Sequence, residues 1–161
     1  MEQKEIRISY QVYKGMDELK DEWRELIREA RKIAEKAWSP YSGFCVGAAV
    51  RLANGTIITG NNQENAAYPS GLCAERTALF YANANYPDIA VESVAITAHN
   101  ARGLVKEPVK PCGSCRQVML ETEFRFKHPI QIILDGQSSI FIFEGVDSLL
   151  PFSFKPASLK E

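Results

Sequence analysis

Two short stretches decide the fold of this chain: Cys73-Ala74-Glu75-Arg76 and Pro111-Cys112-Gly113-Ser114-Cys115. Each places cysteine at the predicted start of a helix, where the backbone dipole lowers thiol pKa values and favours the thiolate. Cys112 and Cys115 are three residues apart, so both sulfurs can face one ion. If the two helix starts converge, Cys73 completes a set of three soft ligands, a donor set that suits zinc.

A site with three protein ligands leaves the fourth tetrahedral position of zinc open, which is typical of catalytic rather than structural zinc. Zinc can lower the pKa of a water in that position to about 7. Glu75 is too close in sequence to Cys73 to serve as the fourth ligand. We therefore predict that Glu75 is a general acid and base beside the metal, a role typically worth roughly 10²–10⁴ in rate.

The apolar pattern on either side of these stretches predicts an α/β protein. Helical spacing is expected over 17–38, 73–85 and 112–123. Strands are expected over 46–52 and 56–60, which form a hairpin around Asn54-Gly55, and over 92–97, 130–134 and 140–143. This order predicts a three-layer α/β/α sandwich with a mixed five-stranded sheet. A further strand over 6–13 belongs to an N-terminal extension, 1–16, of a single domain spanning 1–161.

The composition favours a small neutral substrate. The 161 residues carry a formal net charge of −1, whereas polynucleotide binding draws its affinity from a basic excess. No stretch has the length and apolar character of a bilayer span, and the N-terminus lacks the apolar core of a signal peptide. We therefore expect a cytoplasmic protein without nucleic-acid or membrane partners, whose clustered cysteines bind metal or do chemistry.

Several motifs in order then resemble one family. Cys-Ala-Glu at 73–75, Pro-Cys-x-x-Cys at 111–115, and the segments 41–49 and 62–68 are similar to those of the homotetrameric cytidine deaminases. The resemblance covers about 30–154. It implies one zinc ion per subunit on three cysteines, and hydroxide on that zinc attacking C4 of cytosine, with Glu75 as proton shuttle. It also implies a homotetramer that converts cytidine and deoxycytidine to uridine and deoxyuridine with release of ammonia, in pyrimidine salvage.

The resemblance implies substrate contacts as well. Phe44 is expected near the nucleoside, and Asn62 and Glu64 are expected to bind the ribose 3′-hydroxyl. A carboxylate there also disfavours a 5′-phosphate. The Ala74 backbone is expected to hold the base edge, and Phe154 is expected to reach the site of a neighbouring subunit.

Arg76 has an electrostatic role in this scheme. Three thiolates around Zn²⁺ leave a cluster charge of about −1, which weakens the metal as a Lewis acid. The resemblance places this arginine next to the metal-bound sulfurs. We predict that Arg76 offsets the charge without touching zinc.

Alternatives remain open from the residues alone. Cys112 and Cys115 could be a redox pair, or half of a closed structural zinc site completed by Cys45, although Cys45 is better explained as a small buried residue. Deaminases of deoxycytidylate, guanine, tRNA adenosine or blasticidin S are alternative enzymes. A non-catalytic zinc-binding interaction domain is the alternative outside enzymes, and the presence of Glu75 argues against it.

Overall fold

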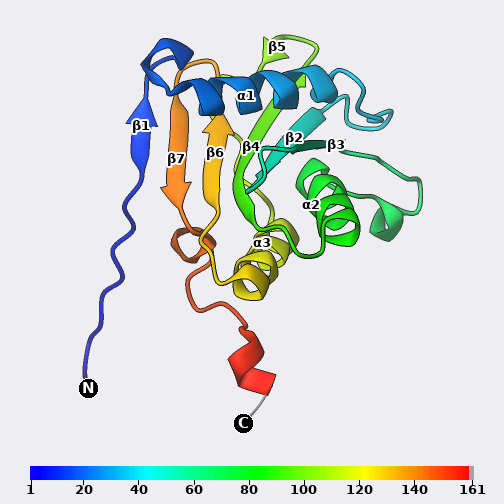
Figure 1. Cartoon of the computed structure of the whole chain (residues 1–161). Coiled ribbons are helices and arrows are strands. Elements are labelled where there is room, and N and C mark those ends of the chain that lie inside the picture. The colour runs from blue at the N-terminus through cyan, green and yellow to red at the C-terminus, as the bar shows by residue number, and fades with distance from the viewer. Residues whose placement is uncertain (160–161) are drawn as a thin grey trace.

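The computed structural model describes residues 1–159 and contains one mixed sheet with helices on both faces (Figure 1). The strand order is β1-β7-β6-β4-β2-β3, and a short β5 pairs with β4. The pairing of β4 with β6 is parallel, whereas the other pairings are antiparallel. The strands are β1 (Gln11–Tyr13), β2 (Cys45–Leu52), β3 (Ile57–Asn61), β4 (Val91–Asn100), β5 (Gly103–Leu104), β6 (Gln131–Asp135) and β7 (Ile140–Glu144). The helices are α1 (Asp21–Ala34), α2 (Ala74–Asn85) and α3 (Gly113–Phe126).

The two faces of the sheet bury separate apolar cores, because successive side chains of a strand point to opposite sides. Ala49 and Ala95 pack with α1 on one face, while their neighbours Val50 and Ile96 belong to the core under α2 and α3. The structure thus has the predicted three layers, with α1 alone on one side and α2 and α3 on the other. Within residues 1–159, no helix combines the length and apolarity needed to cross a membrane.

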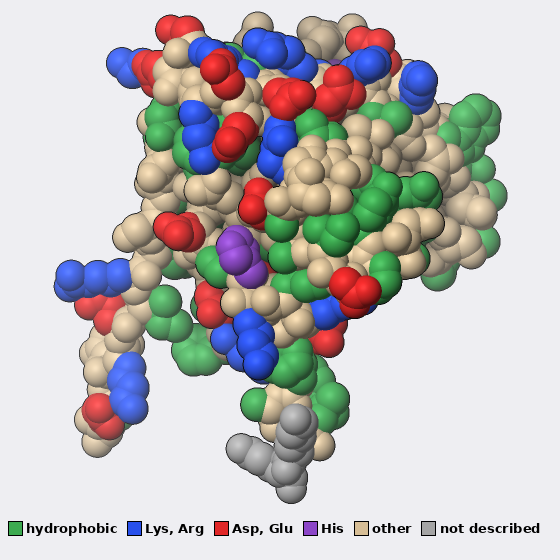
Figure 2. All heavy atoms as spheres, in the orientation of Figure 1, with side chains coloured by type: hydrophobic (Ala, Val, Ile, Leu, Met, Phe, Trp, Pro, Cys, Tyr) green, Lys and Arg blue, Asp and Glu red, His purple; other side chains and the backbone are tan. Residues whose placement is uncertain are grey.

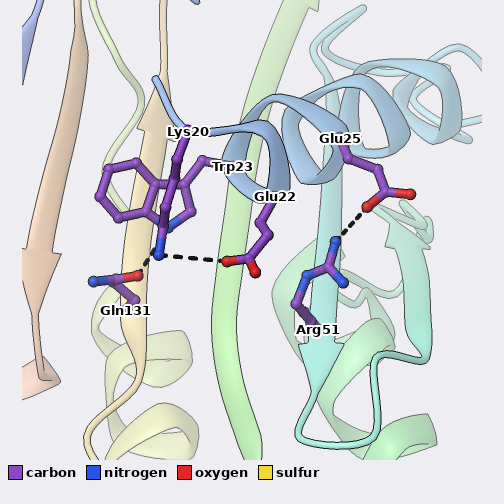
Figure 3. A network of polar contacts seen from close by, with 6 residues as sticks. All are labelled: Lys20, Glu22, Trp23, Glu25, Arg51 and Gln131. Carbon is purple, nitrogen blue, oxygen red and sulfur yellow. Dashed lines mark hydrogen bonds and ion pairs between the residues drawn. The ribbon is translucent and has the colours of Figure 1, made fainter. Parts of the chain in front are cut away.

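Polar contacts also fix α1 to the sheet (Figure 3). The Trp23 indole Nε1 donates a hydrogen bond to Gln131 Oε1 on β6, at 2.8 Å. Arg51 of β2 forms an ion pair with Glu25, which lies two residues after Trp23 in α1. These contacts involve two different strands, so they set both the position and the direction of α1.

An ion pair between a half-exposed arginine and a buried aspartate joins the other end of α1 to the sheet. Asp135, at the end of β6, is fully buried and accepts two hydrogen bonds from Arg31, Nε to Oδ2 at 2.7 Å and Nη2 to Oδ1 at 2.8 Å. Thr97 of β4 donates a third, at 2.7 Å. The Asp135 contact raises the pKa of Arg31 above its ordinary value. A carboxylate can remain buried here because it accepts these three hydrogen bonds, two of them from a cation.

Two glycines permit helices to approach the β2–β3 hairpin on its opposite faces. A Cβ at Gly47 would lie 2.0 Å from the Ala30 carbonyl oxygen of α1. A Cβ at Gly60 would lie 2.6 Å from the Ala78 amide nitrogen of α2. The close approach of α2 matters for function, because its first turn follows Cys73.

The structure corrects three details of the sequence interpretation. The sheet has seven strands instead of five, because β1 and the short β5 join it; β5 lies between the predicted strand 92–97 and the predicted helix 112–123. The N-terminal strand covers only Gln11–Tyr13, because the residues before Gln11 do not pair with β7, although β7 continues to Glu144. The first helix covers Asp21–Ala34 instead of 17–38, because Met16–Glu18 form a separate 3₁₀ turn and Trp38 bridges to Gln63.

Candidate active site

The three predicted metal ligands come together at the starts of α2 and α3. Cys73 is the residue before α2, Cys112 is the residue before α3, and Cys115 lies in the first turn of α3. Their sulfurs all lie within 4.8 Å of one another, with Cys73 Sγ 3.8 Å from Cys112 Sγ and Cys112 Sγ 3.4 Å from Cys115 Sγ. The two helices pack on the same face of the sheet, and this arrangement brings the sulfurs together from sequence positions 39 residues apart.

The donor set fits zinc. A tetrahedral site with Zn–S bonds of about 2.3 Å separates its sulfurs by about 3.8 Å, close to the spacings found here. Within residues 1–159, no fourth Cys, His, Asp or Glu joins the group. Cys45 does not complete a closed site, since its sulfur instead lies 3.1 Å from the Ser39 hydroxyl. The group therefore has the three-ligand composition of catalytic zinc rather than the closed set of a structural site.

The thiols differ in acidity. Hydrogen bonding from Cys115, with smaller contributions from Arg76 and Cys112, lowers the pKa of the Cys73 thiol to about 5 against the opposing effect of partial burial. The same hydrogen bond, together with burial, raises the pKa of Cys115. Cys73 is therefore the more acidic thiol of this pair, and the thiolate is the form of cysteine that binds a divalent metal.

Glu75 lies in the first turn of α2 and is only 4% exposed. Burial raises the pKa of its carboxyl above the ordinary value, and the charge of the neighbouring Cys73 acts in the same direction. A carboxyl group in such surroundings takes up a proton more readily than a surface glutamate does. This is the property required of a group that must both accept and donate protons.

Arg76 follows Glu75 and points back to the cysteine cluster. Its Nη2 lies 3.8 Å from Cys73 Sγ, and the two sulfurs of Cys73 and Cys115 both raise the pKa of the guanidinium. The side chain is thus a cation beside the sulfur cluster.

A pocket of about 610 Å³ opens in front of the cysteines, within the range of small-molecule sites. Of the predicted substrate residues, Asn62, Glu64 and Ala74 line it together with Glu75. The remaining lining comes from the segments 41–46, 62–76 and 109–112. A nucleoside therefore has room between the cysteines and the loop after β3.

Asn62 and Glu64 also hold the pocket wall. Asn62 Oδ1 accepts from the Val46 amide at 2.7 Å, and its Nδ2 donates to the Phe44 carbonyl at 2.9 Å. Glu64 accepts from the Tyr41 amide at 2.9 Å and from the Ser42 hydroxyl at 2.5 Å. These hydrogen bonds lower the pKa of the Glu64 carboxyl, with the Ser42 hydroxyl making the largest contribution.

Two predicted substrate residues do not line this pocket in a single chain. Phe44 is absent from the lining, although its carbonyl is held by Asn62. Phe154 is 59% exposed, and its carbonyl accepts a hydrogen bond from Gln117 of α3 at 3.0 Å.

Sequence reasoning missed two kinds of contact at the site. Tyr41 and Tyr68 line the pocket with their rings 6.4 Å apart, and both stand in the motif segments at 41–49 and 62–68. Arg116, which directly follows Cys115, donates from Nε to the Pro111 carbonyl at 2.7 Å and from Nη1 to the Leu149 carbonyl. An arginine immediately after a metal ligand is a usable signal, but its backbone partners become visible only in three dimensions.

Comparison with known proteins agrees with this geometry. Residues 20–127 match the family described as the cytidine and deoxycytidylate deaminase zinc-binding region. A cytidine deaminase of Halalkalibacterium halodurans is 48% identical over 98 residues, which cover 60% of this chain and 68% of that protein. A cytidine deaminase of Mycobacterium tuberculosis is 33% identical over 113 residues, covering 68% of this chain and 80% of that protein.

A solved structure extends the match in three dimensions. The crystal structure of cytidine deaminase from Burkholderia pseudomallei superposes with a TM-score of 0.69 at 36% identity, covering 81% of this chain and 97% of that chain. The family match includes both helix starts, and all three converging cysteines fall within it. On its sequence and its fold alike, this chain belongs to the cytidine and deoxycytidylate deaminase zinc-binding family.

Proposed function

We propose that this chain is a zinc-dependent cytidine deaminase that hydrolyses cytidine and deoxycytidine to uridine and deoxyuridine with release of ammonia. The observation that carries the proposal is the position of Glu75. Its buried carboxyl shares a pocket of about 610 Å³ with two of three converging cysteines. When bound by Cys73, Cys112 and Cys115, zinc supplies a Lewis acid that lowers the pKa of a water to about 7.

Glu75 moves the protons in this reaction. It accepts one proton from the attacking water and delivers it to N3 of cytosine. The water oxygen forms the new bond to C4, and the second water proton passes through Glu75 to the amino nitrogen. The C4–N4 bond then breaks, ammonia leaves, and the base is uracil. Burial favours this role, because a carboxyl with a raised pKa can hold the proton between transfers.

The other pocket residues orient the nucleoside. Asn62 and Glu64 supply an amide and a carboxylate for the ribose 3′-hydroxyl, and the Ala74 backbone holds the edge of the base. Both side chains are already fixed by the loop 41–46, so they lose little freedom when the sugar binds. Phe44 does not line the pocket of a single chain. It packs near the nucleoside if its own side chain moves, or if it enters the pocket of a neighbouring subunit.

The assembly and the setting complete the proposal. A homotetramer lets the exposed Phe154 of one subunit reach the pocket of a neighbour. We propose that residues 1–161 act as one catalytic domain in a reducing compartment such as the cytoplasm, where the three cysteines stay available to the metal. Its cellular role would be pyrimidine salvage.

The decisive experiment compares the native chain with Glu75→Gln, assaying zinc content, ammonia release and the ultraviolet change of cytidine. We expect zinc in both proteins and a loss of roughly 10²–10⁴ in kcat for the variant. Glu121→Gln, the same change at an exposed position of α3, serves as the control and should keep full activity. Zinc-loaded native protein that leaves cytidine unchanged would contradict the proposal. Turnover of blasticidin S by the same protein would then support the alternative substrate.

A further inference from the structure

Residues 1–10 form an exposed arm that leaves the body of the molecule in line with β1 (Figure 1). The ladder between β1 and β7 covers only Gln11–Tyr13. The backbone of 1–9 therefore has no strand partner among residues 1–159. An extended segment without a partner leaves its backbone donors and acceptors available for another chain.

The arm has an apolar face. Ile6, Ile8, Tyr10 and Val12 alternate along it, and each is between 48% and 56% exposed. The ring of Tyr10 lies 5.2 Å from Phe141 and 5.0 Å from Phe143, measured between centroids. Those contacts place the alternating side chains on the same side of the sheet as α2 and α3. Period-two alternation of this kind is the pattern of a strand with one covered face, yet all four side chains remain about half exposed among residues 1–159.

The charges of the arm are balanced. The arm carries two acidic and two basic side chains: Glu2, Lys4, Glu5 and Arg7. Within one arm, Lys4 Nζ lies 3.8 Å from Glu2 Oε1, and Arg7 Nε lies 3.5 Å from Glu5 Oε1. Figure 2 shows both signs of charge along the projecting segment. Two copies of such a segment do not repel one another.

The charges at Glu5 and Arg7 complement each other in one antiparallel register of two arms, in which Ile8 lies opposite Lys4 and Tyr10 lies opposite Glu2. When two arms pair about a two-fold axis at Ile6, this isoleucine faces its own copy. Glu5 of each arm then lies opposite Arg7 of the other, giving two cross-strand pairs of opposite charge. The paired stretch covers 2–10 on both arms and ends where the ladder with β7 begins.

We propose that this arm pairs antiparallel with the same arm of a second copy of the chain, about a two-fold axis at Ile6. A second copy is the fitting occupant because the charge pattern complements itself, and a two-fold contact satisfies both arms equally. The contact is separate from the deaminase pocket. The strand order puts β1 at one edge of the sheet, whereas the pocket residue Asn62 directly follows β3 at the other edge.

Site-directed cross-linking of the zinc-loaded full chain tests the register. Residues directly opposite in an antiparallel pair have Cβ atoms about 5 Å apart, within reach of a disulfide. Under mild oxidation we expect Ile6→Cys to form a covalent dimer. Gln3→Cys and Ser9→Cys should each stay monomeric on denaturing gels, but mixing the two should yield the cross-linked heterodimer. Native chain oxidised in parallel gives the background from the existing cysteines.

Either of two results would overturn the proposal: no more dimer from Ile6→Cys than from Gln3→Cys, or preferential cross-linking through Ile8→Cys. A charge exchange provides a second check in the Ile6→Cys background. Glu5→Arg should lower the cross-linked fraction by about threefold, and adding Arg7→Glu should restore it. Failure of the double variant to recover would contradict the pairing of Glu5 with Arg7.

Hydrogen exchange measures the pairing without new cysteines. Every second amide within 2–10 should exchange at least roughly tenfold more slowly in the native chain than in Ile8→Pro, because proline is poorly tolerated inside a paired strand. Cytidine turnover should be the same in both, because the arm lies at the opposite edge from the pocket. Equal exchange rates in the two proteins would show that the arm has no partner.

Discussion

Arg76 Nη2 lies 3.8 Å from Cys73 Sγ, so a cation contacts the sulfur cluster without adding a metal ligand. The position follows from helix geometry, because Cys73 and Arg76 are three residues apart at the start of α2 and therefore share one side of the helix. Three thiolates around Zn²⁺ would carry an excess negative charge, and we propose that the Arg76 guanidinium offsets part of it. Contacts of this kind around metal ligands typically affect metal affinity or activity by 10–100-fold.

Replacing Arg76 with glutamine should therefore weaken the site while leaving the fold intact. We expect Arg76→Gln to lose zinc to a chelator more readily, and to lower kcat/KM for cytidine by roughly 10-fold or more. Arg28→Gln, at an exposed position of α1, removes the same charge far from the metal and should behave as the native chain. Unchanged metal retention and turnover in Arg76→Gln would show that its charge does not act on the site.

Glu64 should give the pocket loop a pH dependence. Hydrogen bonds from Ser42 and Tyr41 lower the pKa of this carboxyl below its ordinary value of 4.5. A carboxyl with a depressed pKa in the folded state stabilises that state above pH 4.5, and its contribution is lost as the pH falls through the lower, folded value. The amides of Tyr41 and Ser42 should therefore lose protection below pH 4.5, relative to the core amide of Ile133.

Glu64→Gln separates this effect from general acid unfolding. Glutamine keeps an oxygen acceptor but does not titrate, so the step in exchange of the Tyr41 and Ser42 amides should disappear. Glu121→Gln should retain it. If Glu64→Gln shows the same step as the native chain, then another group controls the loop.

The parts of the site that sequence could predict are local. The Cys-x-x-Cys spacing and the cysteine that precedes a second helix predict the three cysteines that the structure groups, although helix geometry directs only the Cys112 and Cys115 pair and the convergence of the two helix starts had to be assumed. The Asn54-Gly55 pair likewise predicts the hairpin, and Gly55 has the positive φ of 84° that such a turn requires.

The rest depends on partners distant in sequence. Arg31 and Asp135 are 104 residues apart, and either side chain alone looks like an ordinary surface charge. The length of β1 depends on how far the chain pairs with the distant strand β7, which no pattern within residues 1–13 contains. The additional strand β5 is only two residues long, too short for any alternation to be visible.

Gly60 and Gly47 allow the effect of helix position on the metal site to be tested with a matched pair. A Cβ at Gly60 would meet backbone of α2, 2.6 Å from the Ala78 nitrogen and 2.7 Å from the Ala74 oxygen. A Cβ at Gly47 would meet backbone of α1 instead. Both alanine variants should lower the free energy of unfolding, by about 1–3 kcal/mol or more, because overpacking against backbone forces a helix to shift.

Only Gly60→Ala should also disturb catalysis. Its Cβ would displace the first turn of α2, which directly follows Cys73 and contains Glu75. We expect a lower kcat and weaker zinc retention in Gly60→Ala, while Gly47→Ala keeps both at temperatures where it is folded. Chemical denaturation, zinc release and cytidine turnover measure the three quantities. Equal kinetic losses in the two variants would mean that general destabilisation, not the position of α2, accounts for them.

Arg116 should fix the positions of Cys112 and Cys115 through its hydrogen bonds to backbone carbonyls rather than through its charge. Its guanidinium joins the Pro111 carbonyl, directly before Cys112, to the Leu149 carbonyl near the C-terminal end of the chain. Lysine preserves the charge but cannot direct two donors in a planar fork. We expect Arg116→Lys to lose about 1–3 kcal/mol of stability and to release zinc faster, because the segment entering Cys112 is no longer held. Arg125→Lys is the matched control at the far end of α3, where the native side chain donates to the Pro87 carbonyl at 2.6 Å. It should lose stability without faster zinc release, and identical zinc release from both variants would refute a positioning role for Arg116.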